Sequence, residues 1–314
     1  MNYESFLQIA LVKGIGDASI KKIINFIHEN DGFSWDDLCC NKNFLSSILP
    51  SKENINQEIL FQREKAKKLA KTLYEKDIGI VCYKDSQYPQ KLYQSLGTKC
   101  PAFLFYKGNI NLLNNSSVGF CGSRKVSEKG IGITWSCAKK FAKKEIVVVS
   151  GYAAGTDLAA HKSALEYSGA TIFVLAEGIL RMNVKNEIKK LLNNNNHVFV
   201  SQYLPELTWS AGNAMKRNGV IIGLSDAMIL VESGKEGGTF AAGNETLEAR
   251  HPLFVIDFAQ PEVSAEANPY FISKGGIPIR GKDGEPNLEK VFSAIKDRNR
   301  QKKENDCFEQ LKLT

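Results

Sequence analysis

The sequence of 314 residues lacks the features that mark membrane, secreted and metal-binding proteins. No stretch approaches the roughly 18 consecutive apolar residues of a membrane span, and residues 1–12 lack the charged leader and apolar core of a signal peptide. The seven cysteines are scattered, without a C-x-x-C pair or a Cys/His group at zinc spacing, a pattern typical of reduced cytosolic thiols. We therefore expect a cytoplasmic protein that needs neither a metal ion nor a membrane.

Two familiar nucleotide-binding motifs are also missing. The turn that begins at Gly122 does not match the G-x-G-x-x-G fingerprint, and the segment 233–236 fails as a phosphate loop because Glu236 stands where Ser or Thr must bind magnesium. The net charge of +7, from 41 Lys and Arg against 34 Asp and Glu, weakly favours an anionic partner. We expect no cofactor.

The sequence present divides into four segments. Residues 1–75 carry apolar residues at helical spacing and predict a small helical domain. Within it, the segment 13–17 (Lys-Gly-Ile-Gly-Asp) fits a helix-hairpin-helix turn with amides facing a phosphate, and equally a plain connection between packed helices. Residues 76–114, which include a predicted strand at 78–83, are expected to bridge the helical domain and the domain that follows. Residues 291–314 are expected to form a charged tail.

Residues 115–290 alternate short β-rich runs with amphipathic helices, the signature of parallel βαβ units. The fold class is therefore α/β, a doubly wound, Rossmann-like parallel sheet. Ligands of such sheets gather at the carboxyl ends of the strands, so the residues just after each strand are the candidates for function. The six predicted strands are 118–121, 146–150, 171–176, 197–202, 227–232 and 253–257.

Three glycine-rich turns follow these strands. After the first stand Gly122, Ser123, Arg124 and Lys125, where backbone amides, a helix start near Ser127 and a guanidinium can bind a phosphate; a plain strand-to-helix turn is the alternative. After the second and fifth strands, similar turns open helices and can line the same pocket. The further candidates in these turns and in the basic segment upstream of the fifth strand are Gly151, Gly155, Lys216, Arg217, Asn218, Gly237, Gly238 and Thr239.

Several residues in these turns have structural interpretations. Thr156 or Asp157 is expected to cap the helix after the second strand, a role that fits Asp157 better than catalysis. His161 falls between apolar residues on one helical stripe, as a packed histidine would. The basic residues from Lys216 also fit a solvated helix face.

These residues, in this order, resemble the DprA/Smf family of DNA-processing proteins. The motifs are 122–124, SGYAAGTDLAAH at 150–161, the region 216–218 and EGGT at 236–239, with YPQKLYQSL, PAFLFYKGN and NPYFISKGG elsewhere. The resemblance implies an extended Rossmann-like domain, often preceded by a small helical domain, that binds single-stranded DNA without hydrolysing anything. It also implies a homodimer that delivers a RecA-type recombinase onto that DNA, with the candidate residues forming the phosphate pocket.

The chain departs from the family pattern at several positions. Gly219 replaces a usual second Arg, Ala154 replaces the Arg before Gly155, and Thr156 replaces the usual Ile. We also expect no C-terminal winged helix. Because basic residues are lost, the sequence predicts weaker DNA binding than in the family at large.

Two other functions remain open from the sequence. Related Rossmann-like nucleotide hydrolases place a Glu just after a G-G-x-G-T turn, and here Glu245 or Glu248 would carry that role. Neither Glu stands directly in the motif. A sensor that binds a small nucleotide and signals through a partner is a further alternative.

Overall fold

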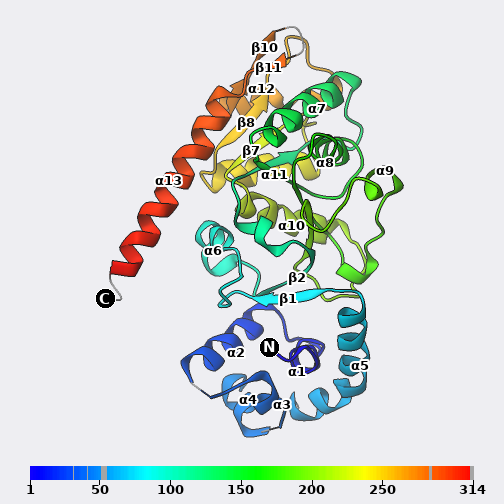
Figure 1. Ribbon diagram of the computed structural model, residues 1–314, viewed down its shortest axis with the longest axis vertical. Helices are drawn as coiled ribbons and strands as arrows, with labels where there is room; N and C mark the ends of the chain where they lie inside the picture. Colours follow the sequence, from blue (N-terminus) through cyan, green and yellow to red (C-terminus); the bar gives the residue numbers. More distant parts are fainter. Residues whose placement is uncertain (31, 41, 51–54, 283–284, 312–314) are drawn as a thin grey trace.

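The computed structural model describes residues 1–30, 32–40, 42–50, 55–282 and 285–311. Figure 1 shows an N-terminal helical bundle packed at one end of a larger body built around a sheet, with the C-terminal helix α13 (Glu289–Leu311) running away from that body. Among the described helices, none is both long and apolar enough to cross a membrane.

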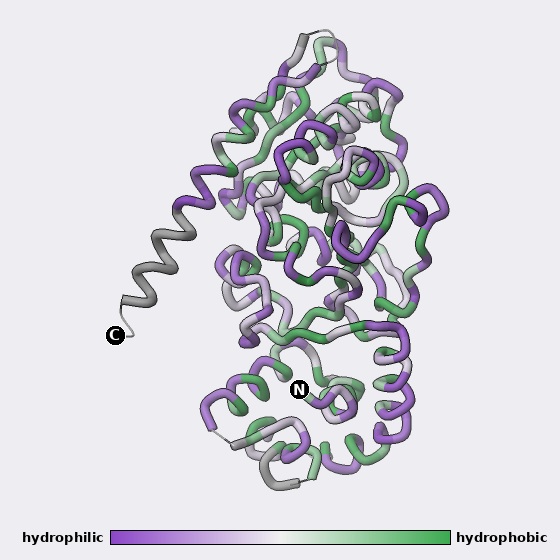
Figure 2. The backbone as a smooth tube through the Cα atoms, viewed as in Figure 1, coloured by the Kyte–Doolittle hydropathy of each residue, from purple (hydrophilic) through white to green (hydrophobic). Residues whose placement is uncertain are grey.

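The N-terminal bundle and the sheet share one hydrophobic core. Phe6 lies at its centre, with ring centroids 5.0 Å from Trp35 in the bundle and 5.2 Å from Phe103 in the sheet. Figure 2 shows purple, hydrophilic stretches alternating with green along the longer bundle helices, because each of these buries only one side. The first helix, by contrast, buries every residue from Ser5 to Ala10. The bundle helices are α1 (Tyr3–Ala10), α2 (Asp17–Glu29), α3 (Trp35–Cys40), α4 (Lys42–Ile48) and α5 (Ile55–Glu75).

The glycine turn between α1 and α2 has a structural role. Gly14 adopts a φ of 79°, which permits the tight reversal. The Asp17 carboxylate then accepts a hydrogen bond from the Ala102 amide at 2.6 Å and pairs with Lys21 at 2.7 Å. Lys21 in turn donates to the Thr98 carbonyl at 2.8 Å. These hydrogen bonds hold the start of α2 against residues 98–102, which precede the second strand of the sheet.

The sheet has nine strands in the order β1-β2-β6-β5-β4-β3-β7-β8-β9. All pairs from β6 to β9 along this order are parallel, while β1–β2 and β2–β6 are antiparallel. The predicted α/β class and Rossmann-like sheet are confirmed. The strands are β1 (Gly79–Cys82), β2 (Phe103–Gly108), β3 (Ser117–Cys121), β4 (Val147–Ser150), β5 (Thr171–Val174), β6 (His197–Ser201), β7 (Ala227–Leu230), β8 (Leu253–Ile256) and β9 (Ile277–Ile279).

Each of the six predicted strands corresponds to one of β3 to β8, but three strands of the nine-stranded sheet lie outside that set. The segment 76–114, expected to be a bridge, supplies β1 and β2, which extend the same sheet. The prediction placed a strand at 78–83 within this bridge and did not recognise β2. The edge strand β9 was missed because Pro278 interrupts a run of only three residues.

Helices cover both faces of the sheet. Two hydrophobic clusters alternate along the strands: Val148 belongs to one cluster, and its neighbours Val147 and Val149 belong to the other. This double coverage explains why the predicted strands are continuous apolar runs. The remaining elements are α6 (Gln90–Leu96), α7 (Glu128–Ala142), α8 (Thr156–Glu166), α9 (Asn186–Lys189), α10 (Ala211–Leu224), α11 (Gly238–Glu248), α12 (Asn268–Ser273), β10 (Gly281–Lys282), β11 (Glu285–Pro286) and the 3₁₀ turns Gly97–Lys99, Ile110–Asn114, Ile179–Arg181 and Val263–Ala265.

The order of the strands reverses beside β3. From β3 the chain proceeds to β4, β5 and β6 on one side and then returns to place β7 on the other side. The carboxyl ends of β3, β4 and β7 therefore meet at one edge of the sheet, at the point where such sheets bind ligands. We call this edge, with the turns that follow the three strands, the rim.

One buried amide holds part of the rim in place. Asn268 accepts a hydrogen bond from the Ser233 amide at 3.0 Å and donates to the carbonyls of Val231 and Ile256 at 2.7 and 2.9 Å. These bonds join the chain after β7 to the end of β8. The turn that follows Ser233 therefore starts from a fixed position.

We predict that Asn268→Ala lowers the free energy of unfolding by at least about 2 kcal/mol, because a buried amide hydrogen and two buried carbonyls lose their partner. Urea unfolding measures the difference. Asn194→Ala, at an exposed site, is the matched control and should change stability by less than about 0.5 kcal/mol. Equal stability of the two variants would contradict this account of Asn268.

Candidate functional site

The turn after β3 presents two exposed cations at the rim. Arg124 and Lys125 are exposed, and the Lys125 amide donates to the Ser123 hydroxyl at 3.0 Å, which shapes the turn. Helix α7 then begins with Ser127 as its N-cap, as expected, and the Ser127 hydroxyl accepts a hydrogen bond from the Gly130 amide at 3.0 Å.

The turn after β4 packs directly against the turn after β3. Gly155 adopts a φ of 76°, and a Cβ at this position would stand 2.5 Å from the Ser123 carbonyl oxygen. The Thr156 amide donates to that same carbonyl at 3.3 Å. A Cβ on Gly122 would likewise stand 2.3 Å from the Thr156 hydroxyl. Glycine is therefore required on both sides of the contact.

The prediction that Thr156 or Asp157 caps the helix in this turn is wrong. Gly155, and neither Thr156 nor Asp157, is the N-cap of α8, and no side chain caps it. Asp157 is instead buried and accepts a long hydrogen bond from the Ala153 amide at 3.3 Å. The reason is steric, because the close approach to Ser123 places a positive-φ glycine where a capping side chain would otherwise stand. The first amides of α8 thus have no side-chain cap.

His161 supports the turn from below. Its Nε2 lies 2.6 Å from the Gly151 carbonyl, and its ring is fully buried against Phe173 at a centroid distance of 4.1 Å. Burial lowers the pKa of His161 to about 3, so the ring is neutral near pH 7 and donates from Nε2. The packed role expected for this residue agrees with its position.

Arg217 is buried under the rim. Only 7% of its surface is exposed, and a Cβ on Gly151 would stand 1.9 Å from its Nη1. Its Nε has no hydrogen-bond partner among the described residues. Burial lowers the pKa of Arg217 while the nearby Asp157 raises it. Arg217 contributes positive charge beneath the turn after β4, whereas its neighbour Lys216 is exposed.

The turn after β7 completes the rim. Glu232 is buried and accepts hydrogen bonds from the Ser127 amide at 2.9 Å and from the Ser264 hydroxyl at 2.7 Å. Beyond it, the exposed Gly237 has a φ of 91° and is the N-cap of α11 without a side-chain cap. Asn218 of α10 donates to the Gly238 carbonyl at 3.4 Å. Gly238 and Thr239 open α11 at the surface, as predicted.

Two side chains at the rim were not predicted from the sequence. The Arg124 guanidinium carbon lies 5.6 Å from the centroid of the Trp209 ring, which belongs to the loop between β6 and α10. Lys185 donates to the Tyr152 carbonyl at 3.2 Å and lies 4.7 Å from the centre of its ring. A lone aromatic or basic residue in a loop follows no periodic pattern, so the sequence carried no signal for either one.

The two carboxylates considered for a hydrolase do not lie in these turns. Glu245 and Glu248 stand seven and ten residues beyond Gly238, the first residue of α11, which places them roughly 10–15 Å along the helix from its start. Burial and the neighbouring Glu248 raise the pKa of Glu245. Among the described residues, no group of His, Cys, Asp and Glu side chains is arranged to hold a metal ion.

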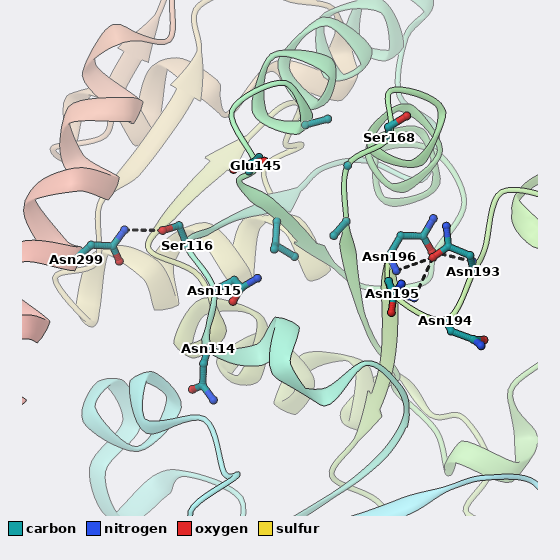
Figure 3. A pocket seen from close by; sticks show the side chains of 14 residues that line it. Asn114, Asn115, Ser116, Glu145, Ser168, Asn193, Asn194, Asn195, Asn196 and Asn299 are labelled. Atoms are coloured by element: carbon teal, nitrogen blue, oxygen red, sulfur yellow. Dashed lines mark hydrogen bonds between the residues drawn. The ribbon is translucent and has the colours of Figure 1, made fainter.

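A wide cavity of about 1370 Å³ lies at the opposite edge of the sheet (Figure 3). Its asparagines take part in local turns: the Asn193 side-chain oxygen accepts hydrogen bonds from the Asn195 and Asn196 amides at 2.9 and 3.0 Å. Across the cavity, Asn299 of α13 donates to the Ser116 hydroxyl at 2.8 Å. The cavity contains none of the predicted site residues.

Comparisons with known proteins agree with the fold and the order of motifs. The family model described as "DNA recombination-mediator protein A" matches residues 79–283. The DNA processing protein DprA of Bacillus subtilis is 25% identical over 230 residues, which cover 72% of this chain and 74% of that protein. DprA of Streptococcus pneumoniae is 32% identical over 174 residues, covering 55% of this chain and 60% of that protein.

Two solved structures share the architecture. The X-ray structure of DprA from Streptococcus pneumoniae matches with a TM-score of 0.73 and 25% identity, covering 90% of this chain and 96% of that one. A structure of DNA processing protein A from Helicobacter pylori, reported for its single-stranded DNA binding mode, matches with a TM-score of 0.57 and 21% identity. It covers 71% of this chain and 96% of that one, and at this identity it supports the fold alone.

The buried histidine generates a pH-dependent prediction. Below pH 6.5 the unfolded chain binds a proton that the folded His161 does not, so the free energy of unfolding falls as the pH falls from 6.5 toward 3. Between about pH 8 and about pH 5 this loss amounts to about 2 kcal/mol. His161→Gln, which stays neutral, should lack that part of the pH dependence in urea unfolding. Identical pH dependence in both proteins would contradict the assignment.

Proposed function

Because the chain belongs to the family of DNA recombination-mediator protein A, we propose that its rim binds the phosphate backbone of single-stranded DNA. The observation that carries the proposal is the exposed Arg124 guanidinium, which stands where the glycine-rich turns after β3 and β4 pack together. A guanidinium binds a phosphate through two parallel hydrogen bonds, and glycines let a strand approach the backbone closely.

The helices that start at the rim add to this affinity. Gly237, the N-cap of α11, has no side-chain cap, so the first amides of α11 are available to an anion. The first amide of α8, that of Thr156, donates to the Ser123 carbonyl instead. Lys125 and Lys216 are exposed beside them, and the buried Arg217 adds positive charge from below. These contacts address phosphates and not base edges, which supports binding with little sequence preference.

We infer a binding role and not a hydrolytic one. The candidate carboxylates Glu245 and Glu248 stand well along α11 from the rim. The carboxylates nearer to it, Asp157 and Glu232, are buried and accept backbone hydrogen bonds. A catalytic acid or base must reach the substrate, and these positions serve the turns.

We further propose that the bound strand is delivered to a RecA-type recombinase in the cytoplasm and that the protein acts as a homodimer. The description of the family as recombination mediators supports the delivery of the strand to a recombinase. The homodimer rests on the resemblance of the sequence motifs to the DprA/Smf family.

We predict that Arg124→Glu weakens binding of a labelled oligothymidine by at least about tenfold, because a charge-assisted contact becomes a repulsion. Fluorescence anisotropy measures the affinity. Lys144→Glu makes the same charge change beyond the end of α7, at the opposite edge of the sheet, and should have a much smaller effect. If the two variants bind alike, or Arg124→Glu binds as the wild type does, the assigned rim is wrong.

A further inference from the structure

Trp209 is an exposed aromatic residue at the rim, and the proposed phosphate contacts give it no role. It lies in the loop between β6 and α10 with 49% of its surface exposed, although the Arg124 guanidinium lies over its ring. Leu207 and Met215 are exposed on the same stretch, at 42% and 52%. An indole of this size costs free energy when water surrounds it, so its exposure at the rim is a feature to be explained.

The main chain on both sides of Trp209 is fixed. The Leu207 carbonyl accepts a hydrogen bond from the Gly178 amide at 2.8 Å, and the Thr208 carbonyl accepts one from the Asn213 side chain at 3.4 Å. After the ring, the Ser210 hydroxyl caps α10 by accepting from the Asn213 amide at 3.1 Å. The indole is therefore presented from a held backbone, and less conformational entropy is lost when a ligand packs on it.

The neighbouring guanidinium narrows the class of ligand. A nucleotide carries one phosphate and one flat ring joined by a sugar, and here a phosphate-binding cation lies over one flat ring, 5.6 Å from its centroid. Proteins that bind single strands combine such cations with aromatic rings on which bases stack. Duplex DNA keeps its bases paired and stacked inside, so it offers no free base to this ring.

We propose that Trp209 stacks on one base of the bound single strand while Arg124 holds a phosphate next to that base. This inference rests on the proposed function and adds a base contact to it. Because every base has a flat face, the contact raises affinity and favours single strands over duplexes without selecting a sequence.

Tryptophan fluorescence measures the proposed stacking of a base on Trp209 directly. The chain has three tryptophans, and the other two are Trp35, which is 7% exposed inside the N-terminal bundle, and Trp135, which is half-buried on α7. Oligothymidine should quench the emission of the full-length wild type, and Trp209→Phe should show no such quenching while retaining most of the affinity. Quenching that persists in Trp209→Phe, or that is absent in a wild type that binds, overturns the inference.

Affinity measurements separate stacking from a purely structural role. Trp209→Ala should bind oligothymidine about tenfold more weakly than the wild type. It should bind a strand of the same length without bases as the wild type does, and the salt dependence of its binding should be unchanged. If Trp209 only positions Arg124, Trp209→Ala will also weaken binding of the base-free strand and lower the salt dependence, and the inference fails.

The same titrations distinguish this inference from the proposed function. If the wild type binds oligothymidine and Trp209→Ala binds it equally well, only the stacking contact is wrong. If the wild type binds neither strand, the proposed function and the stacking contact fail together. Thermal unfolding checks that each variant is folded. Its midpoint temperature should stay close to that of the wild type because Trp209 is half exposed.

Discussion

The contact between the Ser123 carbonyl and the Thr156 amide sets how the turns after β3 and β4 pack together at the rim. It requires a positive φ at Gly155 and no side chain at Gly122, and it brings the turns after β3 and β4 together. Arg124 is the residue that follows this contact, so its backbone position is determined by it. Any ligand at the rim therefore meets a turn and a helix start whose main chains are joined directly.

Buried polar groups hold the turns from the inside of the protein. Glu232 fixes the start of α7, and Asn268 fixes the chain after β7. His161 holds the Gly151 carbonyl, and Arg217 lies beneath the same turn. Burying polar groups costs free energy unless they are hydrogen-bonded, so the bonded side chains of Glu232, Asn268 and His161 indicate that they maintain the shape of the rim.

The sequence predicted the centre of the sheet and the positions of the glycine-rich turns. Continuous apolar runs such as 146–149 identify strands covered on both faces, and glycines soon after them mark the turns. The edges were harder, because β9 is a three-residue run with a proline. The burial of Arg217, the uncapped start of α8 and the position of Trp209 depend on contacts between distant segments, which no local pattern encodes.

Titration of labelled single-stranded and double-stranded DNA at two salt concentrations tests phosphate recognition by the rim most directly. For three or more phosphate contacts, the dissociation constant for the single strand should rise at least about tenfold between about 50 and about 200 mM salt. The duplex should bind more weakly at both concentrations. Binding that is indifferent to salt, or absent at low salt, would contradict the account.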